Sequence, residues 1–206
     1  MVPLGWRNTS SMIYRRYYHT ASVLTDGKVL VTGGLWTTTG NMNIARTEHT
    51  ASVLINGKVL VVGGVKTGSE ILYSAEFYDP LTGVWTTTGN MTIPRYLHTA
   101  SVLTNEKVLV TGGSNGLWTT TGSMNNARYL HTTSVLTNGK VLVTGGLISS
   151  INQNSAELYE PLTGLWTTTS SMNNARHWHT ESILTNGDVL VTGGYVSSAL
   201  NSCELY

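Results

Sequence analysis

The sequence repeats itself, and this internal repeat constrains the fold more than any other feature. One copy reads WTTTGSMNNARYLHTTSVLTNGKVLVTGG over residues 118–146, and the copies start near residues 6, 36, 85, 118 and 166. Arg-x-x-His marks every copy, and successive histidines are 30, 49, 33 and 48 residues apart. We therefore expect short and long versions of one structural unit, stacked within a single domain that covers residues 1–206.

Each copy contains a predicted β-hairpin. In HTASVLTDGKVLVTGG, two apolar runs flank Asp26-Gly27, and later copies have Asn-Gly at the same place. This dipeptide predicts a type I′ turn between antiparallel strands. The third copy has Asn105-Glu106 instead, and glutamate is strained at positive φ, so we expect a changed or strained turn there. The apolar residues are consecutive rather than alternating, which predicts strands buried on both faces.

The long copies contain a further segment. It reads SAEFYDPLTGVW over residues 74–85 and SAELYEPLTGLW over residues 155–166. Each segment predicts a third strand, a turn at Pro-Leu-Thr-Gly and a fourth strand that opens with tryptophan. No helical period occurs in the chain, so the expected fold class is all-β with four strands in each long unit.

These residues carry a resemblance to a known family. A glycine pair ends the second strand, a tyrosine lies in the third and a tryptophan in the fourth: Gly63-Gly64, Tyr78 and Trp85 in one copy, and Gly145-Gly146, Tyr159 and Trp166 in another. This order resembles the kelch motif. The resemblance implies a kelch-type β-propeller, whose blades are four-stranded sheets. We expect about five blades, two of them short, in a ring closed by pairing of the N- and C-terminal strands around Trp6 and CELY.

The short copies lack the third strand. From Gly64 to Trp85 is 21 positions, but from Gly34 to Trp36 is only two. Three explanations are open at this point. The short units are three-stranded blades, or the chain after Gly34 is coil and the propeller is damaged, or the missing residues were lost from the sequence itself.

We interpret the repeated arginines, histidines and tryptophans as structural. Equivalent histidines on separate blades surround an axis and do not converge on one ion, so we expect no metal site. The arginines can pair with Glu76, Glu157 and Glu204 of the third strands, and the tryptophans can fill space between blades. The residues are Arg16, His19, Arg46, His49, Arg95, His98, Arg128, His131, Arg176, His179, Trp6, Trp36, Trp85, Trp118 and Trp166.

Composition excludes several partners and leaves the compartment undetermined. The net charge of +1 gives no reason to expect nucleic acid, and no apolar run reaches membrane-spanning length. The first residues lack the features of a secretory signal, so the chain is cytoplasmic or a fragment of an extracellular protein. A single Cys203 excludes an internal disulfide.

We expect no enzymatic activity and no cofactor. Galactose oxidase is built around a kelch-type propeller, and that resemblance implies two tyrosine and two histidine copper ligands with a tyrosine–cysteine crosslink. Here Cys203 lies in an ordinary third strand, and only His177 stands outside the repeated histidines. His177 and Trp178 replace the Tyr-Leu of other copies and are interpreted as variation in a loop.

The segments after the glycine pairs differ between copies, and variable loops on a rigid scaffold are where binding specificity normally resides. We therefore predict a non-catalytic scaffold that binds a protein partner through these loops. The alternative is a secreted carbohydrate-binding or galactose-oxidase-like propeller. The candidate binding residues are Lys66, Glu70, Asn115, Asn152 and Gln153.

Overall fold

The computed structural model describes residues 18–32, 42–114 and 123–206, and all the regular elements in them are β-strands. The predicted all-β class is confirmed. Over the same ranges there is no helix that could cross a membrane. Five of the residues singled out above lie outside the described residues: Trp6, Arg16, Trp36, Asn115 and Trp118.

The two long units form four-stranded antiparallel sheets, as expected. The first has the order β3 (Thr50–Val53), β4 (Val59–Val62), β7 (Ala75–Asp79) and β8 (Val84–Thr87). The second has the order β11 (Thr132–Val135), β12 (Val141–Thr144), β15 (Ala156–Glu160) and β16 (Leu165–Thr169). The register pairs Tyr78 with Trp85, and their ring centroids are 5.0 Å apart. The motif tyrosine and tryptophan thus pack together on the outer strands.

The remaining units have fewer described strands. The first consists of β1 (Thr20–Val23) and β2 (Val29–Thr32), and the third of β9 (Tyr96–Val102) and β10 (Val108–Ser114). The last unit has the order β17 (Thr180–Ile183), β18 (Val189–Thr192) and β19 (Cys203–Leu205). Within the described ranges the short units have no counterpart of β7 or β15. The segments 33–41 and 115–122, on which the explanations of the short units depend, lie outside those ranges.

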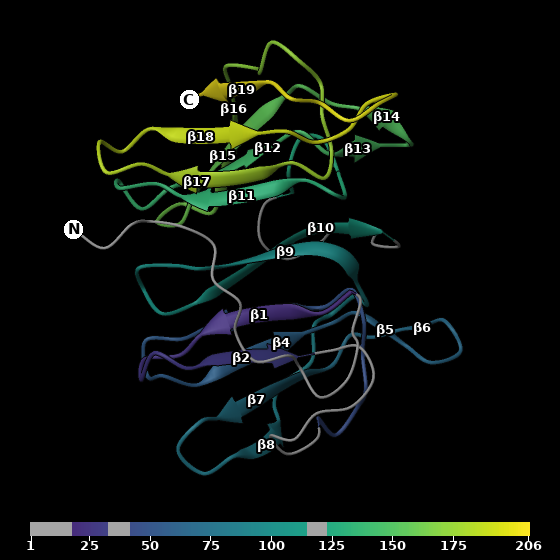
Figure 1. Ribbon diagram of the computed structural model, residues 1–206, viewed down its shortest axis with the longest axis vertical. Coiled ribbons are helices and arrows are strands. Elements are labelled where there is room, and N and C mark those ends of the chain that lie inside the picture. The colour runs from purple at the N-terminus through teal and green to yellow at the C-terminus, as the bar shows by residue number, and fades with distance from the viewer. Residues whose placement is uncertain (1–17, 33–41, 115–122) are drawn as a thin grey trace, which may run out of the picture.

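Two of the loops predicted to be variable contain small hairpins that the sequence analysis did not predict. One is formed by β5 (Val65–Lys66) and β6 (Glu70–Ile71), and the other by β13 (Leu147–Ile148) and β14 (Ile151–Asn152). Both project from the end of the molecule that we call the loop end, at the right of Figure 1. The Asx-Gly turns lie at the opposite end, which we call the turn end.

The predicted type I′ geometry of these turns is wrong. Gly27 donates its backbone N–H to the Leu24 carbonyl at 2.9 Å, so Thr25 and Asp26 are the central residues of the turn. Among the described turn residues, positive φ occurs at the glycines and at Glu106, whereas a type I′ turn needs it at both central residues. A type I turn followed by a left-handed residue accounts for this pattern. Glu106 occupies that position with φ 66°, so the strain expected in the third copy is present and the turn itself is unchanged.

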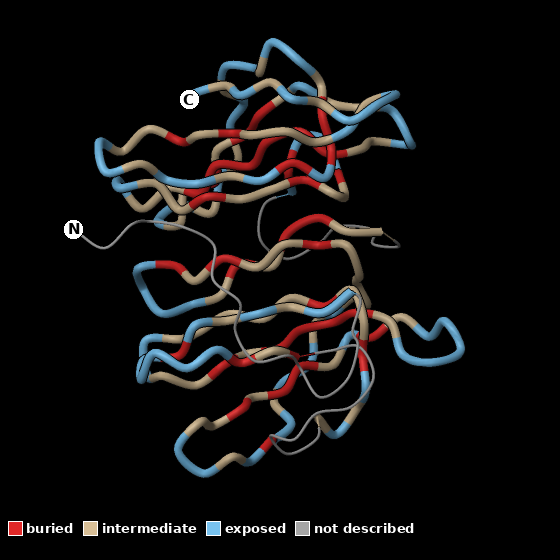
Figure 2. Tube along the Cα trace, viewed as in Figure 1, coloured by how far each residue is buried: buried red, intermediate tan, exposed pale blue. Residues whose placement is uncertain are grey.

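The first strands of the units lie beside one another in chain order: β1, β3, β9, β11 and β17. Clusters of buried apolar side chains pack between neighbouring units. Leu24 and Leu30 pack with Val59 and Val61, and Leu142 packs with Val189. Val59, Val61 and Val189 lie on the second strands β4 and β18 and have no exposed surface, whereas the first strands β1, β3 and β17 contain no buried residue (Figure 2). The second strands of the long units, β4 and β12, are buried on both faces, as their consecutive apolar residues predict. In the other units the prediction holds only in part, because β18 alternates buried and half-buried residues and Val29 of β2 is 58% exposed.

Candidate binding site at the histidine hollow

The residue before the repeated histidine has a positive φ in every unit. The values lie between 50° and 56° and belong to Tyr18, Glu48, Leu97, Leu130 and Trp178. These side chains are not glycine, so each backbone is held in a region that such residues seldom occupy. In three units, the residue two positions before the histidine forms an antiparallel backbone bridge with the first residue after the glycine pair, as Tyr129 does with Leu147. The Arg-x-x-His segment and the variable loop of a unit therefore lie side by side.

The described histidines from His49 onward each contact the preceding unit. His49 Nε2 lies 3.1 Å from Thr20 Oγ1 and 3.0 Å from Thr32 Oγ1, on the first and second strands of the unit before it. His131 and His179 make the same paired contacts with Thr99 and Thr111 and with Thr132 and Thr144. His98 lies 3.0 Å from Thr50 alone, because valine replaces the second threonine at position 62. One imidazole thus joins each pair of consecutive units, and we call this contact a joint.

Burial keeps these imidazoles neutral at pH 7. Loss of hydration on burial, with a smaller effect of the neighbouring arginine, lowers the pKa of His49 and of His179 to about 4. The same two causes lower the pKa of His98 and of His131 to about 3. The Nδ1 atom of each has no hydrogen-bond partner among the described residues.

The arginines of the long units and the last unit are buried against carboxylates. Arg46 donates to Glu76 at 2.6 Å, and neither side chain has exposed surface. Arg128 pairs with Glu157 at 2.9 Å and Arg176 with Glu204 at 2.7 Å, as the sequence analysis expected. Each carboxylate also accepts two backbone N–H groups from the segment just before its arginine, for example from Asn125 and Asn126. The pair therefore fixes that segment against the third strand of its own unit.

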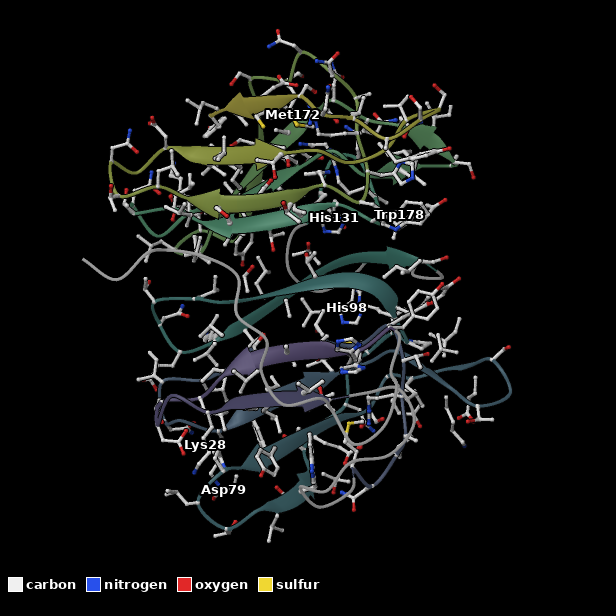
Figure 3. All side chains as sticks on the ribbon, in the orientation of Figure 1. Lys28, Asp79, His98, His131, Met172 and Trp178 are labelled. Atoms are coloured by element: carbon white, nitrogen blue, oxygen red, sulfur yellow. The ribbon has the colours of Figure 1, made fainter. Side chains whose placement is uncertain are left out.

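Side chains of four successive units line an open hollow of about 250 Å³, which we call the histidine hollow. Its lining consists of the four joint histidines and the residue before each of them, namely Glu48, His49, Leu97, His98, Leu130, His131, Trp178 and His179. In Figure 3, Trp178 lies at the loop end beside His131, whereas Lys28 and Asp79 lie at the turn end. The hollow is therefore a feature of the loop end.

An aromatic cluster stands at the rim of this hollow. His177 is buried, its Nδ1 lies 2.6 Å from Asn152 Oδ1, and its ring centroid is 4.7 Å from that of Trp178 and 5.6 Å from that of Tyr195. Trp178 is nevertheless 65% exposed. The interpretation of His177 and Trp178 as loop variation missed this cluster. The available signal was that Trp178 and Tyr195 place aromatic rings where most other copies have a leucine, valine, glutamate or serine.

The candidate binding residues fall into two groups. Lys66 and Glu70 pair with each other at 2.8 Å across the exposed β5–β6 hairpin. Asn152 holds His177, and the Gln153 carbonyl accepts the Arg176 backbone N–H at 3.0 Å. The last two residues thus support the rim rather than project from it. His19 is exposed, in contrast to the joint histidines.

The described residues do not fit a copper site of the galactose oxidase kind. Cys203 is exposed on β19, the outermost described strand of its unit, and pairs in register with Thr192. The joint histidines direct Nε2 toward threonine hydroxyls, and His177 is bonded to Asn152. Within the described ranges, there is no group of three histidine, cysteine or acidic residues that could hold a metal ion.

Comparison with known proteins identifies the family of the repeat. The kelch motif matches residues 46–92 and 127–173, which are the two long units. A novel fungal alcohol oxidase with catalytic diversity among the AA5 family, solved in complex with copper, has a similar structure. The TM-score is 0.74 at 20% identity, and the match covers 94% of this chain and 51% of the oxidase, so the chain spans about half of that protein's length. At this identity the likeness concerns the fold alone. No curated protein sequence matches the chain.

Proposed function

The chain is a kelch-repeat protein, and we propose that it is a non-catalytic scaffold that binds a protein partner at its loop end. One observation carries the proposal. In the described units, four of the repeated histidines contact threonine and three of the repeated arginines pair with glutamate, while the residues that differ between units gather at one end. Variation on a rigid frame is the usual arrangement of a recognition surface.

The two ends of the molecule differ in this respect. At the turn end, the described turns keep the same hydrogen bonds from unit to unit, including the one at Glu106. At the loop end, one unit presents the charged tip of β5–β6, another presents β13–β14, and the last presents the segment around Tyr195. The proposed partner surface is therefore the loop end.

Exchange of loop tips tests this proposal. We expect a chain in which residues 66–70 and 148–151 are exchanged to keep its melting temperature and to lose the partners that the natural chain captures from its source cells. The matched control is the double variant Leu81→Ser/Leu162→Ser, which changes side chains that are 97% and 93% exposed in the β7–β8 and β15–β16 turns. Equal capture by the exchanged chain and the natural chain would refute the proposal.

We also propose the finer architecture: one domain of about five blades, closed by a strand around Trp6 that pairs with β19. The support is the alignment of Ala156-Glu157-Leu158 with Cys203-Glu204-Leu205, which gives β19 the position of a third strand. Because Ala156 pairs with Thr169, Cys203 is expected to face Thr9. Such a pair has a Cα separation suited to a disulfide. Thr9→Cys should therefore crosslink to Cys203 within the monomer on mild oxidation, and Asn8→Cys should not. Failure of Thr9→Cys to crosslink would count against closure.

A further inference from the structure

We propose that the histidine hollow receives a lysine or arginine side chain of the partner, with its cation between the Trp178 indole and the Glu48 carboxylate. This inference rests on the proposed function, because it specifies one contact of the partner at the loop end. It concerns only residues that line the hollow and the rim residues that hold Trp178 in place.

Trp178 is held in an exposed position at some energetic cost. Its φ of 53° is unfavourable for a bulky side chain, and 65% of it faces solvent. The Asn152–His177 contact and the ring of Tyr195, whose centroid is 6.2 Å from that of Trp178, fix its orientation. A preformed indole loses little conformational freedom on binding, and indole is the aromatic face that attracts cations best.

Glu48 supplies the charge. Among the described residues that line the hollow it is the one acidic residue, and none of them is a lysine or arginine. In the described part of the chain, no Lys or Arg nitrogen lies within 4.0 Å of its carboxylate, whereas Glu76, Glu157 and Glu204 are all paired. Glu48 is also only half-buried, so its carboxylate can be reached from the loop end. A partly desolvated carboxylate without a cation favours a basic ligand group.

The remaining lining suits an alkyl stem. Leu97 and Leu130 provide apolar walls, and the histidines are neutral because burial keeps them unprotonated at pH 7. Lysine and arginine place their methylene groups on such surfaces and extend the charge beyond them. A volume of about 250 Å³ is below the usual range for small-molecule pockets and suits a single side chain. A sugar would need several polar side chains around its hydroxyl groups. The described lining offers the Glu48 carboxylate, the Trp178 indole N–H and imidazoles whose Nε2 atoms already contact threonine.

Blocked tripeptides test the inference directly. Acetyl-Ala-Arg-Ala-amide, or the same peptide with glutamine in place of arginine, is titrated into the ¹⁵N-labelled chain. The NMR signal of the Trp178 indole N–H is followed, and this signal is assigned by its loss in Trp178→Phe. We expect the arginine peptide to shift this signal and to saturate in the millimolar range, and the glutamine peptide to leave it unchanged. Glu48→Gln should weaken binding by roughly fivefold or more, while Glu106→Gln, which changes an exposed carboxylate at the turn end, should leave it unchanged.

The outcomes separate this inference from the carbohydrate alternative and from the protein-binding proposal. An unshifted Trp178 signal, or equal binding by Glu48→Gln and the natural chain, overturns the inference. A shift with methyl galactoside but not with the arginine peptide also overturns it and favours the carbohydrate alternative. If loop exchange abolishes partner capture but the peptide does not bind, the proposed function stands and this inference fails. If the peptide binds but loop exchange leaves capture intact, the protein-binding proposal fails instead.

Discussion

At the scale of single residues, the buried ion pairs explain why arginine and glutamate recur at fixed distances in the sequence. Glu157 holds the Arg128 guanidinium and two backbone N–H groups, so its carboxylate is fully hydrogen-bonded without water. Replacing such a pair with apolar residues can be neutral, but removing one partner leaves a buried charge uncompensated. The function of the pair is therefore to fix the segment before each first strand.

We expect Glu157→Gln to lower the free energy of unfolding by about 3–5 kcal/mol. The control is Glu160→Gln, which removes a half-exposed pair with Lys140 at 3.5 Å and should cost less than about 1 kcal/mol. Urea titration of both variants, monitored by circular dichroism, measures the difference. Similar midpoints for the two variants would show that the buried pair does not hold the segment.

At the scale of elements, the sequence predicted the strands well and the turns only in part. Alternation of apolar runs with Asx-Gly and Pro-Leu-Thr-Gly located the four strands of each long unit, because those dipeptides stop a strand whichever turn they form. The turn type was wrong because Asn-Gly suits both geometries and only the backbone angles distinguish them. The rim was missed because Tyr195 is distant in sequence from His177 and Trp178, and only the backbone bridge brings these side chains together.

The turn at Glu106 offers a reciprocal test. Glu106→Gly removes the strain of a side chain at φ 66° and should raise stability by about 1 kcal/mol. Gly139→Glu places the same strain in the equivalent turn, where φ is 81°, and should lower stability by a similar amount. Thermal melts of both variants check the pair. If the two changes shift the melting temperature in the same direction, backbone strain is not the cause.

The glycine pairs test the joints between units. Gly145 and Gly193 have nearly equal φ, 59° and 62°, so alanine carries the same backbone penalty at both. A Cβ on Gly145 would lie 2.5 Å from the Arg176 carbonyl oxygen and 2.8 Å from His179 Cε1, whereas the nearest described atom to a Cβ on Gly193 would be 3.6 Å away. Gly193→Ala should therefore cost about 1–2 kcal/mol and Gly145→Ala clearly more. Equal denaturation midpoints would mean that the joint can move apart without cost.

At the scale of the whole molecule, the joints make stability depend on pH. Burial lowers the pKa of His49 and His179 to about 4 and of His98 and His131 to about 3, from an ordinary value of 6.5. Between pH 6.5 and these values, the unfolded chain binds protons that the folded chain does not, so stability falls as the pH falls. Each imidazole contributes a slope of about 1.4 kcal/mol per pH unit, and together they rival the stability of a typical domain.

We therefore expect full stability above pH 7 and a steep loss between pH 6.5 and 4.5. Glu204 contributes little in this range: burial opposes the shift, but hydrogen bonds from Asn173, Asn174 and Arg176 lower its pKa below the ordinary 4.5. Urea midpoints at half-unit steps of pH measure the slope. His98→Gln removes one titrating joint, the one that contacts a single threonine, and should flatten the profile while the other joints keep its direction. A midpoint that stays constant from pH 7 to pH 5 would show that the histidines are not buried between units in solution.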